Sequence, residues 1–318
     1  MSQKAMGFVG VDTAHSSIMR VFPLWAEHLH LPTRLLRGHD IPLESPDAVY
    51  RDLVTSIAQD QNHLGALVTT HKIRLYEAAH DLFDDLDDFS RQCGEISSIS
   101  KRHGRLRGAA KDPVTAGLAI AEILPAGWFR RTGGEVLCLG SGGAGTAIST
   151  HLGGTDHRHG DRTPGVTLTD VSSKRLAHVR DVHTRAGLDP SLFRYVLVTS
   201  ADQAREVVAA SPPHSLVVNA TGLGKDRPGS PVPDDTVFPR GAVVWEINYR
   251  GPLGFLRLAQ RQQQARGLLV ADGWRYFIHG WTQVIAEVFD ISMPADTVEE
   301  LAALAGQLAP DHPPSLPQ

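Results

Sequence analysis

The stretch EVLCLGSGGAGTAIS, residues 135–149, decides the fold of this chain. An apolar run at residues 136–139 leads directly into a glycine-rich turn, and a helix-compatible segment follows. This order of strand, tight turn and helix presents backbone N–H groups and a helix N-terminus with no Cβ atoms in the way, an arrangement that holds a pyrophosphate. The alternative is a turn that is tight for structural reasons only. We assign Gly140, Ser141, Gly142, Gly143 and Ala144 to dinucleotide binding.

The next predicted strand, GVTLTD at residues 165–170, ends in an acidic residue. A carboxylate at this point accepts hydrogen bonds from both ribose hydroxyls of NAD and repels the 2′-phosphate of NADP. Asp170 therefore favours NAD as the cofactor over NADP. Alternatively, Asp170 caps the helix that starts near Ser172, and Lys174 or Arg175 reaches a phosphate.

Short β-branched runs alternate with amphipathic segments on both sides of this loop, which is the pattern of βαβ units and parallel sheets. We expect strands at 7–11, 33–37, 65–70, 95–99 and 105–110 before the loop, and at 165–170, 195–198, 215–221, 242–249 and 268–271 after it. Helices are expected at 16–29, 45–59 with Ser45 as its cap, 114–124, 172–186, 273–289 and 295–308. The sequence therefore predicts an α/β fold whose second half is a Rossmann-type, doubly wound parallel sheet.

Length and composition narrow the class of protein. The 318 residues favour two domains or one large α/β unit, and 42% hydrophobic with 21% charged residues is typical of globular chains. A net charge of -4 without any basic block predicts neither a nucleic-acid partner nor a membrane partner. The start MSQKAMGFVG lacks a signal-peptide pattern, and no run of about 18 apolar residues occurs, so we expect a cytoplasmic protein. Cys93 and Cys138 lie in apolar segments and are expected to be buried, reduced thiols.

Several segments, in this order along the chain, resemble the shikimate/quinate dehydrogenase family. His15 and Ser16 resemble the first His-Ser of the family's HSxSP segment, and the segment from Val68 to Lys72 resembles VTxPxK. GEISSI at 94–99 stands where the family has GAVNT, and GRLRGAAKD at 104–112 where it has a GxNTD ending. NATGLG at 219–224 resembles NxTxxG, and EINYRGPLG at 246–254 resembles the strand and tyrosine turn before the closing helices.

The resemblance implies a division into domains. Residues 1–113 would form an α/β domain that binds substrate, 114–272 the NAD(P)-binding Rossmann domain, and 273–318 C-terminal helices that pack back on the first domain, with a frayed tail. It also implies that Asn219, Thr221 and Gly222 contact the cofactor. The implied substrate-binding residues are His15, Ser16, Thr69, Ser97, Tyr249 and His279. Core packing is the alternative for His279, and core packing or a cofactor contact near the nicotinamide is the alternative for Tyr249.

By the same resemblance, Lys72 is the catalytic lysine and Asp112 the catalytic aspartate. Oxidation of a secondary alcohol needs a group that takes the hydroxyl proton while hydride leaves the same carbon. A partly desolvated lysine held by a carboxylate can move that proton. Without the flanking matches, Lys72 would be a surface lysine at a helix N-terminus and Asp112 a cap before Pro113.

The chain departs from the family at positions expected to face substrate. Ile18 replaces the second serine of HSxSP, Ser97 the asparagine of GAVNT, and Ala110 and Lys111 the asparagine and threonine of GxNTD. Loss of these donors and acceptors removes partners for ring hydroxyls and a carboxylate, and an unmatched buried polar group costs about 1–3 kcal/mol. We therefore expect a cyclic polyol, a cyclitol or a hydroxy-ketone as substrate, in place of shikimate itself.

The favoured function is thus an NAD-dependent oxidoreductase that interconverts a secondary alcohol and a ketone. Two alternatives remain, a lyase or dehydratase that reuses Lys72 as a base, and a nucleotide-binding sensor without turnover. We expect a monomer or homodimer. We expect no metal site, because His157 and His159 lie in a polar loop with Asp156 and Asp161 but without a structured third ligand. The run Asp84, Asp85, Asp87 and Asp88 is expected to be a solvated helix face.

Overall fold

The computed structural model describes residues 3–154, 161–224 and 228–308. Its contacts divide the chain into two compact units. Among the described residues, unit one comprises 3–112 and 278–308, and unit two comprises 113–277. The second boundary falls inside helix α11, so that one continuous helix belongs to both units.

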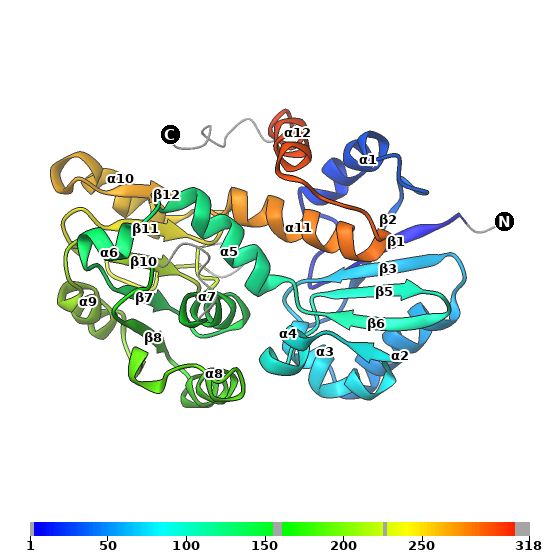
Figure 1. Ribbon diagram of the computed structural model, residues 1–318, viewed down its shortest axis with the longest axis horizontal. Coiled ribbons are helices and arrows are strands. Elements are labelled where there is room, and N and C mark those ends of the chain that lie inside the picture. The colour runs from blue at the N-terminus through cyan, green and yellow to red at the C-terminus, as the bar shows by residue number, and fades with distance from the viewer. Residues whose placement is uncertain (1–2, 155–160, 225–227, 309–318) are drawn as a thin grey trace. The chain divides into compact units, whose positions relative to one another are not determined.

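Unit one contains a six-stranded mixed sheet in the order β2-β1-β3-β5-β6-β4 (Figure 1). Three parallel strands form one half of it: β1 (Ala5–Gly10), β2 (Leu36–Asp40) and β3 (His63–Val68). A hairpin of β5 (Ser98–Arg102) and β6 (Arg105–Ala109) joins β3 in antiparallel fashion, and the short β4 (Asp85–Leu86) pairs in parallel with β6. The sheet therefore differs from a purely parallel α/β sheet in its second half.

Helices cover both faces of this sheet. On one face, Tyr50 and Val54 of α2 and Leu75 of α3 pack with strand residues such as Val68. On the other face, the ring of Phe8 meets Trp281 of α11 edge-on at 5.0 Å. The bounds are α1 (Ile18–His28), α2 (Asp47–Gln59), α3 (Lys72–Ala79), the 3-10 turn η1 (His80–Leu82), α4 (Asp88–Cys93), α11 (Trp274–Phe289) and α12 (Ala295–Gly306).

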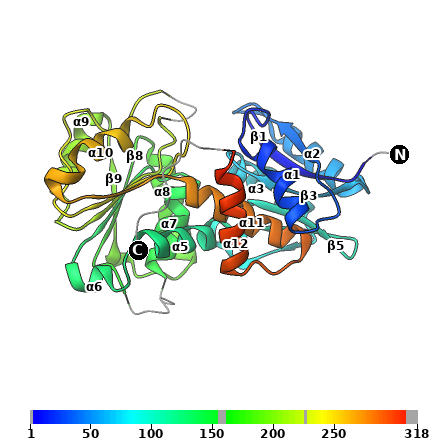
Figure 2. The ribbon, with the colours of Figure 1, turned by 90° about the horizontal axis from the view of Figure 1, so that it is seen from above.

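The end of the chain completes unit one. Trp25 of α1 is fully buried, and its indole N–H donates to the carbonyl oxygen of Leu301 in α12 at 2.7 Å. His28, one turn later, lies 2.8 Å from the Glu300 carboxylate. Figure 2 shows α12 and the second half of α11 alongside the N-terminal helix α1. Helices α1 and α12 thus form one layer on this sheet.

Unit two is a parallel sheet in the order β12-β11-β10-β7-β8-β9. Read from β9, this is the strand order of the doubly wound dinucleotide-binding fold, with the change of direction between β7 and β10. The bounds are β7 (Val136–Leu139), β8 (Val166–Asp170), β9 (Phe193–Leu197), β10 (Leu216–Asn219), β11 (Val243–Glu246) and β12 (Leu269–Ala271). All six strands overlap the segments expected from the sequence.

Two helical layers sandwich this sheet (Figure 2). Val136 and Cys138 of β7 face one core cluster, built with α5 and α7, whereas Leu137 and Leu139 face another, built with α9 and α10. Because both faces are covered, β7 reads as four consecutive apolar residues without alternation. The helices are α5 (Asp112–Ile123), α6 (Trp128–Thr132), α7 (Gly143–Gly153), α8 (Ser173–Arg185), η2 (Pro190–Leu192), α9 (Ala201–Ala210) and α10 (Gly254–Arg266).

Some local expectations for unit one are wrong. Strand β2 begins three residues later than expected, because this edge strand contains exposed polar residues that do not stand out from a loop. Ser45 does not cap α2, since its hydroxyl donates to the carbonyl oxygen of Pro42 at 2.9 Å and Pro46 occupies the cap position. The predicted frayed tail after residue 308 lies outside the described residues.

The two cysteines agree with the expectation of buried thiols. Cys93 and Cys138 are free and buried, and burial raises the pKa of Cys138 to about 12. Within the described residues, every helix is too short or too polar to cross a membrane.

Because histidines are buried in the folded chain, the free energy of unfolding depends on pH in the acidic range. His183 of α8 accepts or donates hydrogen bonds to Ser149 at 2.9 Å and Tyr195 at 2.7 Å, and burial lowers its pKa to about 4. The unfolded chain therefore binds a proton before the folded chain does, and stability present above the unfolded value of 6.5 is lost as pH falls toward 4. We expect the melting temperature to fall across this window and to fall less steeply in His183→Gln. An equal slope in both proteins would contradict this assignment. Burial also lowers the pKa of His63 to about 4, so His63 contributes to the slope that remains in His183→Gln.

Candidate functional site

Lys72 and Asp112 form an ion pair inside unit one, through the Lys72 Nζ and the Asp112 Oδ2. Lys72 is the first residue of α3, and Asp112 the first residue of α5, so each lies where a strand-to-helix turn ends. The backbone N–H of Lys72 donates to the carbonyl oxygen of Thr69 at 3.2 Å, which fixes the start of α3. The side chains are 21% and 8% exposed, so the amine retains some access to solvent while the carboxylate does not.

Opposing effects act on the amine of Lys72. Burial lowers its pKa, but the negative charges of Asp112 and Glu95 and the hydrogen bond to Asp112 outweigh burial and raise the pKa above its ordinary value. Lys72 is therefore an ammonium group in the free protein. A buried ammonium held by one carboxylate is a proton donor whose position is defined.

Sequence reasoning missed Glu95, a second carboxyl group beside this pair. Glu95 is 1% exposed, and burial first, then the charge of Asp112, raises its pKa to about 8. The segment of Glu95 is attached on both sides, because Ile96 N–H donates to the carbonyl oxygen of Lys72 at 3.1 Å and Ser97 N–H to that of Ala109 at 3.0 Å. The available signal was a glutamate between small and apolar residues.

The segment that carries Asp112 is also tied to helix α11. Lys111, directly before Asp112, pairs with Glu287 at 2.5 Å between Nζ and Oε2. Burial raises the pKa of Glu287, but Lys111, Arg107 and Arg102 outweigh burial and lower it overall. Glu287 is therefore a carboxylate that anchors this segment from the last part of the chain.

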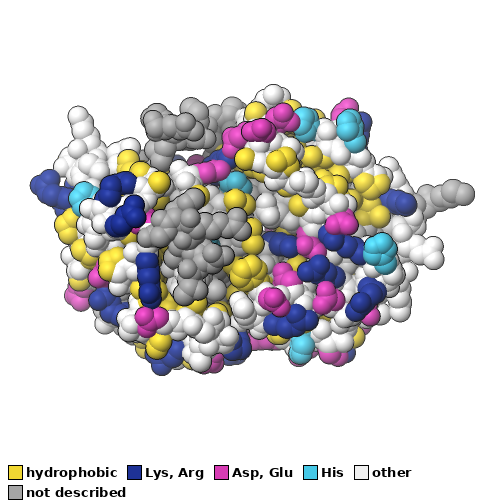
Figure 3. All heavy atoms as spheres, viewed as in Figure 1, with side chains coloured by type: hydrophobic (Ala, Val, Ile, Leu, Met, Phe, Trp, Pro, Cys, Tyr) yellow, Lys and Arg dark blue, Asp and Glu magenta, His cyan; other side chains and the backbone are white. Residues whose placement is uncertain are grey.

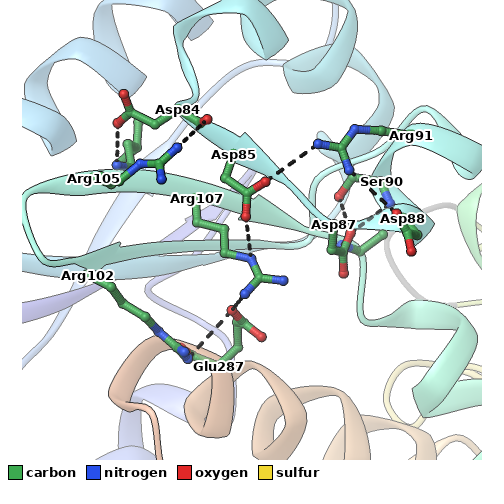
Figure 4. A network of polar contacts seen from close by, with 12 residues as sticks. Asp84, Asp85, Asp87, Asp88, Ser90, Arg91, Arg102, Arg105, Arg107 and Glu287 are labelled. Atoms are coloured by element: carbon green, nitrogen blue, oxygen red, sulfur yellow. Dashed lines mark hydrogen bonds and ion pairs between the residues drawn. The ribbon is translucent and has the colours of Figure 1, made fainter.

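The acidic run at residues 84–88 is not the solvated helix face that the sequence predicts. Asp85 lies in β4, whereas Asp87 caps α4 by accepting the N–H of Ser90 at 2.8 Å. Figure 4 shows Arg107 between Asp85 and Glu287, at 3.4 and 3.7 Å. Basic and acidic side chains also lie intermixed on the face of unit one in Figure 3. Adjacent carboxylates are tolerated here because Arg107 of β6 and Arg91 of α4 pair with them.

The glycine loop joins β7 to α7 in unit two, and its glycines serve different steric needs. Gly140 has φ +100°, and a Cβ there would lie 2.7 Å from the Ala220 carbonyl carbon. At Gly145 a Cβ would lie 2.1 Å from the Gly140 oxygen, so helix and strand can approach only without it. A Cβ at Gly142, the N-cap of α7, would meet no atom within 4 Å. The loop thus leaves open space in front of the N-terminus of an eleven-residue helix, which fits a phosphate group.

Asp170, at the end of β8, is joined to this loop. Its Oδ2 accepts from the N–H and the hydroxyl of Ser141, at 2.9 and 3.0 Å, and its Oδ1 accepts from the N–H of Ser172 at 2.9 Å. Arg175 lies 3.8 Å from Oδ1. The contacts of Asp170 agree with both interpretations, since its carboxylate lies at the glycine loop and also orders the start of α8.

A buried amide and carboxyl network follows β10 and β11. Asn219 Oδ1 accepts from the N–H and hydroxyl of Thr221, at 3.1 and 2.7 Å, and its Nδ2 donates to Glu246 at 2.7 Å. Burial raises the pKa of Glu246 to about 7. Gly222 has φ +76°, which allows the turn after Thr221. These residues fix the loop after β10, the strand that borders β7.

The other predicted substrate-binding residues differ in burial and in the unit to which they belong. His15 is 79% exposed and pairs with Asp12 at 2.8 Å, whereas Ser16 is nearly buried before α1. Ser97 uses its hydroxyl to accept the N–H of Lys111 at 2.7 Å. His279 is buried in α11, within unit one. Tyr249 belongs to unit two, where its ring packs on Phe277 at 4.5 Å between centroids.

The histidines considered as metal ligands lie in the loop of residues 153–165, of which residues 155–160 lie outside the described residues. His157, His159 and Asp156 lie outside the described residues, whereas Asp161 accepts backbone N–H groups of Phe129 and Arg130 and so orders the start of α6. Among residues 3–154, 161–224 and 228–308, no cluster of three His, Cys, Asp or Glu side chains could hold a metal ion.

Comparisons with known proteins agree with one another. No family model matches the chain. It is 30% identical over 278 residues to the shikimate dehydrogenase (NADP(+)) of Methylobacterium radiotolerans, covering 85% of this chain and 86% of that protein. Among solved structures, quinate dehydrogenase from Corynebacterium glutamicum in complex with NAD has a TM-score of 0.69 at 19% identity, covering 95% and 98% of the two chains. Shikimate 5-dehydrogenase from Thermus thermophilus in complex with NADP(H) and shikimate has a TM-score of 0.66 at 24% identity, covering 95% and 100%.

Proposed function

Because this chain belongs to the shikimate dehydrogenase family, we propose that it is a nicotinamide-dependent dehydrogenase that interconverts a secondary alcohol and a ketone on a cyclic polyol or cyclitol. The observation that carries the proposal is the ion pair between Lys72 and Asp112, two residues forty positions apart that the fold of unit one brings together. Residues 1–113 and 273–318 serve the substrate, and residues 114–272 serve the cofactor.

The cofactor would be held by the residues of unit two. Gly142 and the N-terminus of α7 offer space and N–H groups for the pyrophosphate, and the loop of Asn219, Thr221 and Gly222 lies after the neighbouring strand β10. The carboxylate of Asp170 favours NAD. The matched relative in Methylobacterium is named for NADP(+), so the choice between the two cofactors requires a measurement.

Lys72 moves the proton in this mechanism. The bound nicotinamide cofactor supplies the acceptor or donor of hydride. In ketone reduction the Lys72 ammonium gives a proton to the carbonyl oxygen, and in alcohol oxidation the neutral amine takes it back. Asp112 holds the amine in place and orients the substrate hydroxyl. The raised pKa of Lys72 keeps the donor form dominant, which favours ketone reduction at neutral pH.

Three side chains of unit one support a substrate other than shikimate. Ala110 carries no amide, and its backbone N–H donates to Asp87 at 3.0 Å. Ile18 is fully buried in α1 and carries no hydroxyl. The hydroxyl oxygen of Ser97 already accepts a hydrogen bond from the backbone N–H of Lys111. A ligand with fewer or differently placed hydroxyl and carboxylate groups than shikimate suits this environment.

The test of the function is absorbance at the reduced-nicotinamide band during incubation with cyclic polyols, cyclitols, hydroxy-ketones, shikimate and quinate. We expect reduction of NAD with a member of the first three classes. Product formed without any change in cofactor redox state would instead identify a lyase or dehydratase, and cofactor binding without chemistry on any compound would identify a sensor.

Replacement of Asp170 tests the cofactor assignment. In Asp170→Ala, the carboxylate that repels a 2′-phosphate is gone while Arg175 remains, so we expect the preference for NAD over NADP to fall by roughly ten-fold or more. The measurement is the ratio of kcat/KM for the two cofactors. An unchanged ratio, with Arg175→Ala as the matched control, would show that Asp170 only orders the start of α8.

A further inference from the structure

Glu95 is a buried acid that the proposed mechanism leaves unused. The residue is 1% exposed, and within the described residues its Oε1 atom has no hydrogen-bond partner. A buried carboxyl oxygen without a partner destabilises the fold, because water no longer solvates it. Structural need alone therefore does not account for a glutamate at this position.

The backbone places Glu95 next to the dyad. The following residue, Ile96, donates its N–H to the carbonyl oxygen of Lys72 at 3.1 Å. Ser97, two residues after Glu95, donates its N–H to the carbonyl oxygen of Ala109 at 3.0 Å, three residues before Asp112. Glu95 thus lies in the segment that connects the beginning of α3 with the strand that leads to Asp112.

Three charged groups from three elements act on Glu95: Lys72 at the start of α3, Asp112 at the start of α5, and Asp87 before α4. An ionised Glu95 would add a further negative charge to a buried site in which Asp112 already neutralises Lys72. Burial, followed by the charge of Asp112, therefore favours the neutral acid, and Lys72 offsets this only in part.

We propose that Glu95 is a positioning residue that acts through Lys72: as a neutral acid it lets Lys72 give up its proton, and its ionisation makes Lys72 retain that proton. When Glu95 ionises, its proton goes to water and the new carboxylate stabilises the neighbouring ammonium. The inference rests on the proposed function, because the amine whose protonation Glu95 controls is the amine that moves the proton in the proposed mechanism.

A direct test needs no turnover. The chain has six lysines, so carbon-13 at lysine Cε gives a simple spectrum in which Lys72 is identified by its loss in Lys72→Arg. In Glu95→Gln we expect the Lys72 titration to move to lower pH by roughly one unit, because a carboxylate that favoured the ammonium is removed. The matched control is Asp88→Asn, which removes a carboxylate that is 92% exposed in the adjacent helix α4. A Lys72 titration that is the same in Glu95→Gln and in the unmodified protein overturns the proposal.

The unmodified protein provides a second measurement in case Glu95→Gln does not fold. Infrared spectra recorded from neutral to alkaline pH should show the loss of a protonated carboxyl band near pH 8. Glu246, with a pKa raised to about 7, contributes an earlier step that Glu246→Gln removes. Absence of the later step in Glu246→Gln means that Glu95 is ionised throughout, and overturns the proposal.

Kinetics separate this inference from the proposed function. The rate of ketone reduction should fall at alkaline pH as Lys72 loses its proton, and in Glu95→Gln this limb should move to lower pH by the same amount as the lysine titration, with KM unchanged. A lysine titration that moves while the kinetic limb stays fixed shows that Lys72 is not the acid, and the proposed mechanism fails. An unmoved lysine titration in an active variant overturns the role of Glu95 alone.

Discussion

Replacement of Lys72 by alanine should lower kcat roughly a hundred- to ten-thousand-fold, which is the usual contribution of a positioned acid or base. In the proposed mechanism the amine exchanges a proton with the substrate oxygen, and Asp112 holds the amine in place. Cofactor affinity should not change, because the glycine loop and Asp170 belong to unit two. Steady-state kinetics and calorimetric titration with NAD measure the two effects separately.

Two companion variants make this result specific. Lys4→Ala removes an exposed lysine of the same unit and should leave kcat unchanged. Asp112→Asn keeps a partner for the amine but removes the charge that raises the pKa of Lys72, so it should move the alkaline limb of ketone reduction to lower pH. If Lys72→Ala keeps more than about a tenth of the normal kcat, a hundred-fold contribution from this amine is excluded.

Alanine at two glycines of the same loop should have opposite consequences. In Gly142→Ala the added methyl group meets no protein atom within 4 Å, so the melting temperature should not change, while affinity for the cofactor should fall at least ten-fold because the methyl group occupies space meant for phosphate. In Gly145→Ala the methyl group would lie 2.1 Å from the Gly140 oxygen, so the protein should lose about 1–3 kcal/mol of stability.

Thermal unfolding and cofactor titration of both variants measure this contrast. Gly267→Ala is the control for a glycine replacement outside the loop. Its added methyl group meets no atom within 4 Å, so its only expected cost in stability comes from the backbone φ of +65°. Normal cofactor affinity in Gly142→Ala would mean that the open space in front of α7 does not receive a phosphate, and would remove the basis for placing the cofactor there.

The sequence predicts unit two better than unit one for a physical reason. Strands such as β7 and β10 are covered on both faces and therefore read as unbroken apolar runs. The edge strand β2 has one buried residue followed by partly or fully exposed ones, a pattern that does not differ from that of a loop. The placement of Ser45 as a cap failed because a competing carbonyl, that of Pro42, lies within reach of its hydroxyl.

The candidate site shows a similar division. The pairing of Lys72 with Asp112 could be anticipated from the resemblance of their flanking segments, but the burial of Glu95 could not. A glutamate in GEISSI does not reveal whether it points to solvent. Only the fold shows that it is buried and that the charges of Lys72, Asp112 and Asp87 act on it. The anchoring of Lys111 by Glu287 is likewise a contact between segments 176 residues apart that no local pattern indicates.

The bond from Trp25 to Leu301 has a consequence for biosynthesis. Unit one includes α12 as well as residues before 113, so it is still incomplete when residues 113–277 of unit two have been synthesised. We therefore expect unit two to be complete before unit one, the reverse of the usual order in which the N-terminal domain folds first. Until α12 has been synthesised, the indole of Trp25 lacks its partner carbonyl, and we expect this part of unit one to stay open to chaperones and proteases.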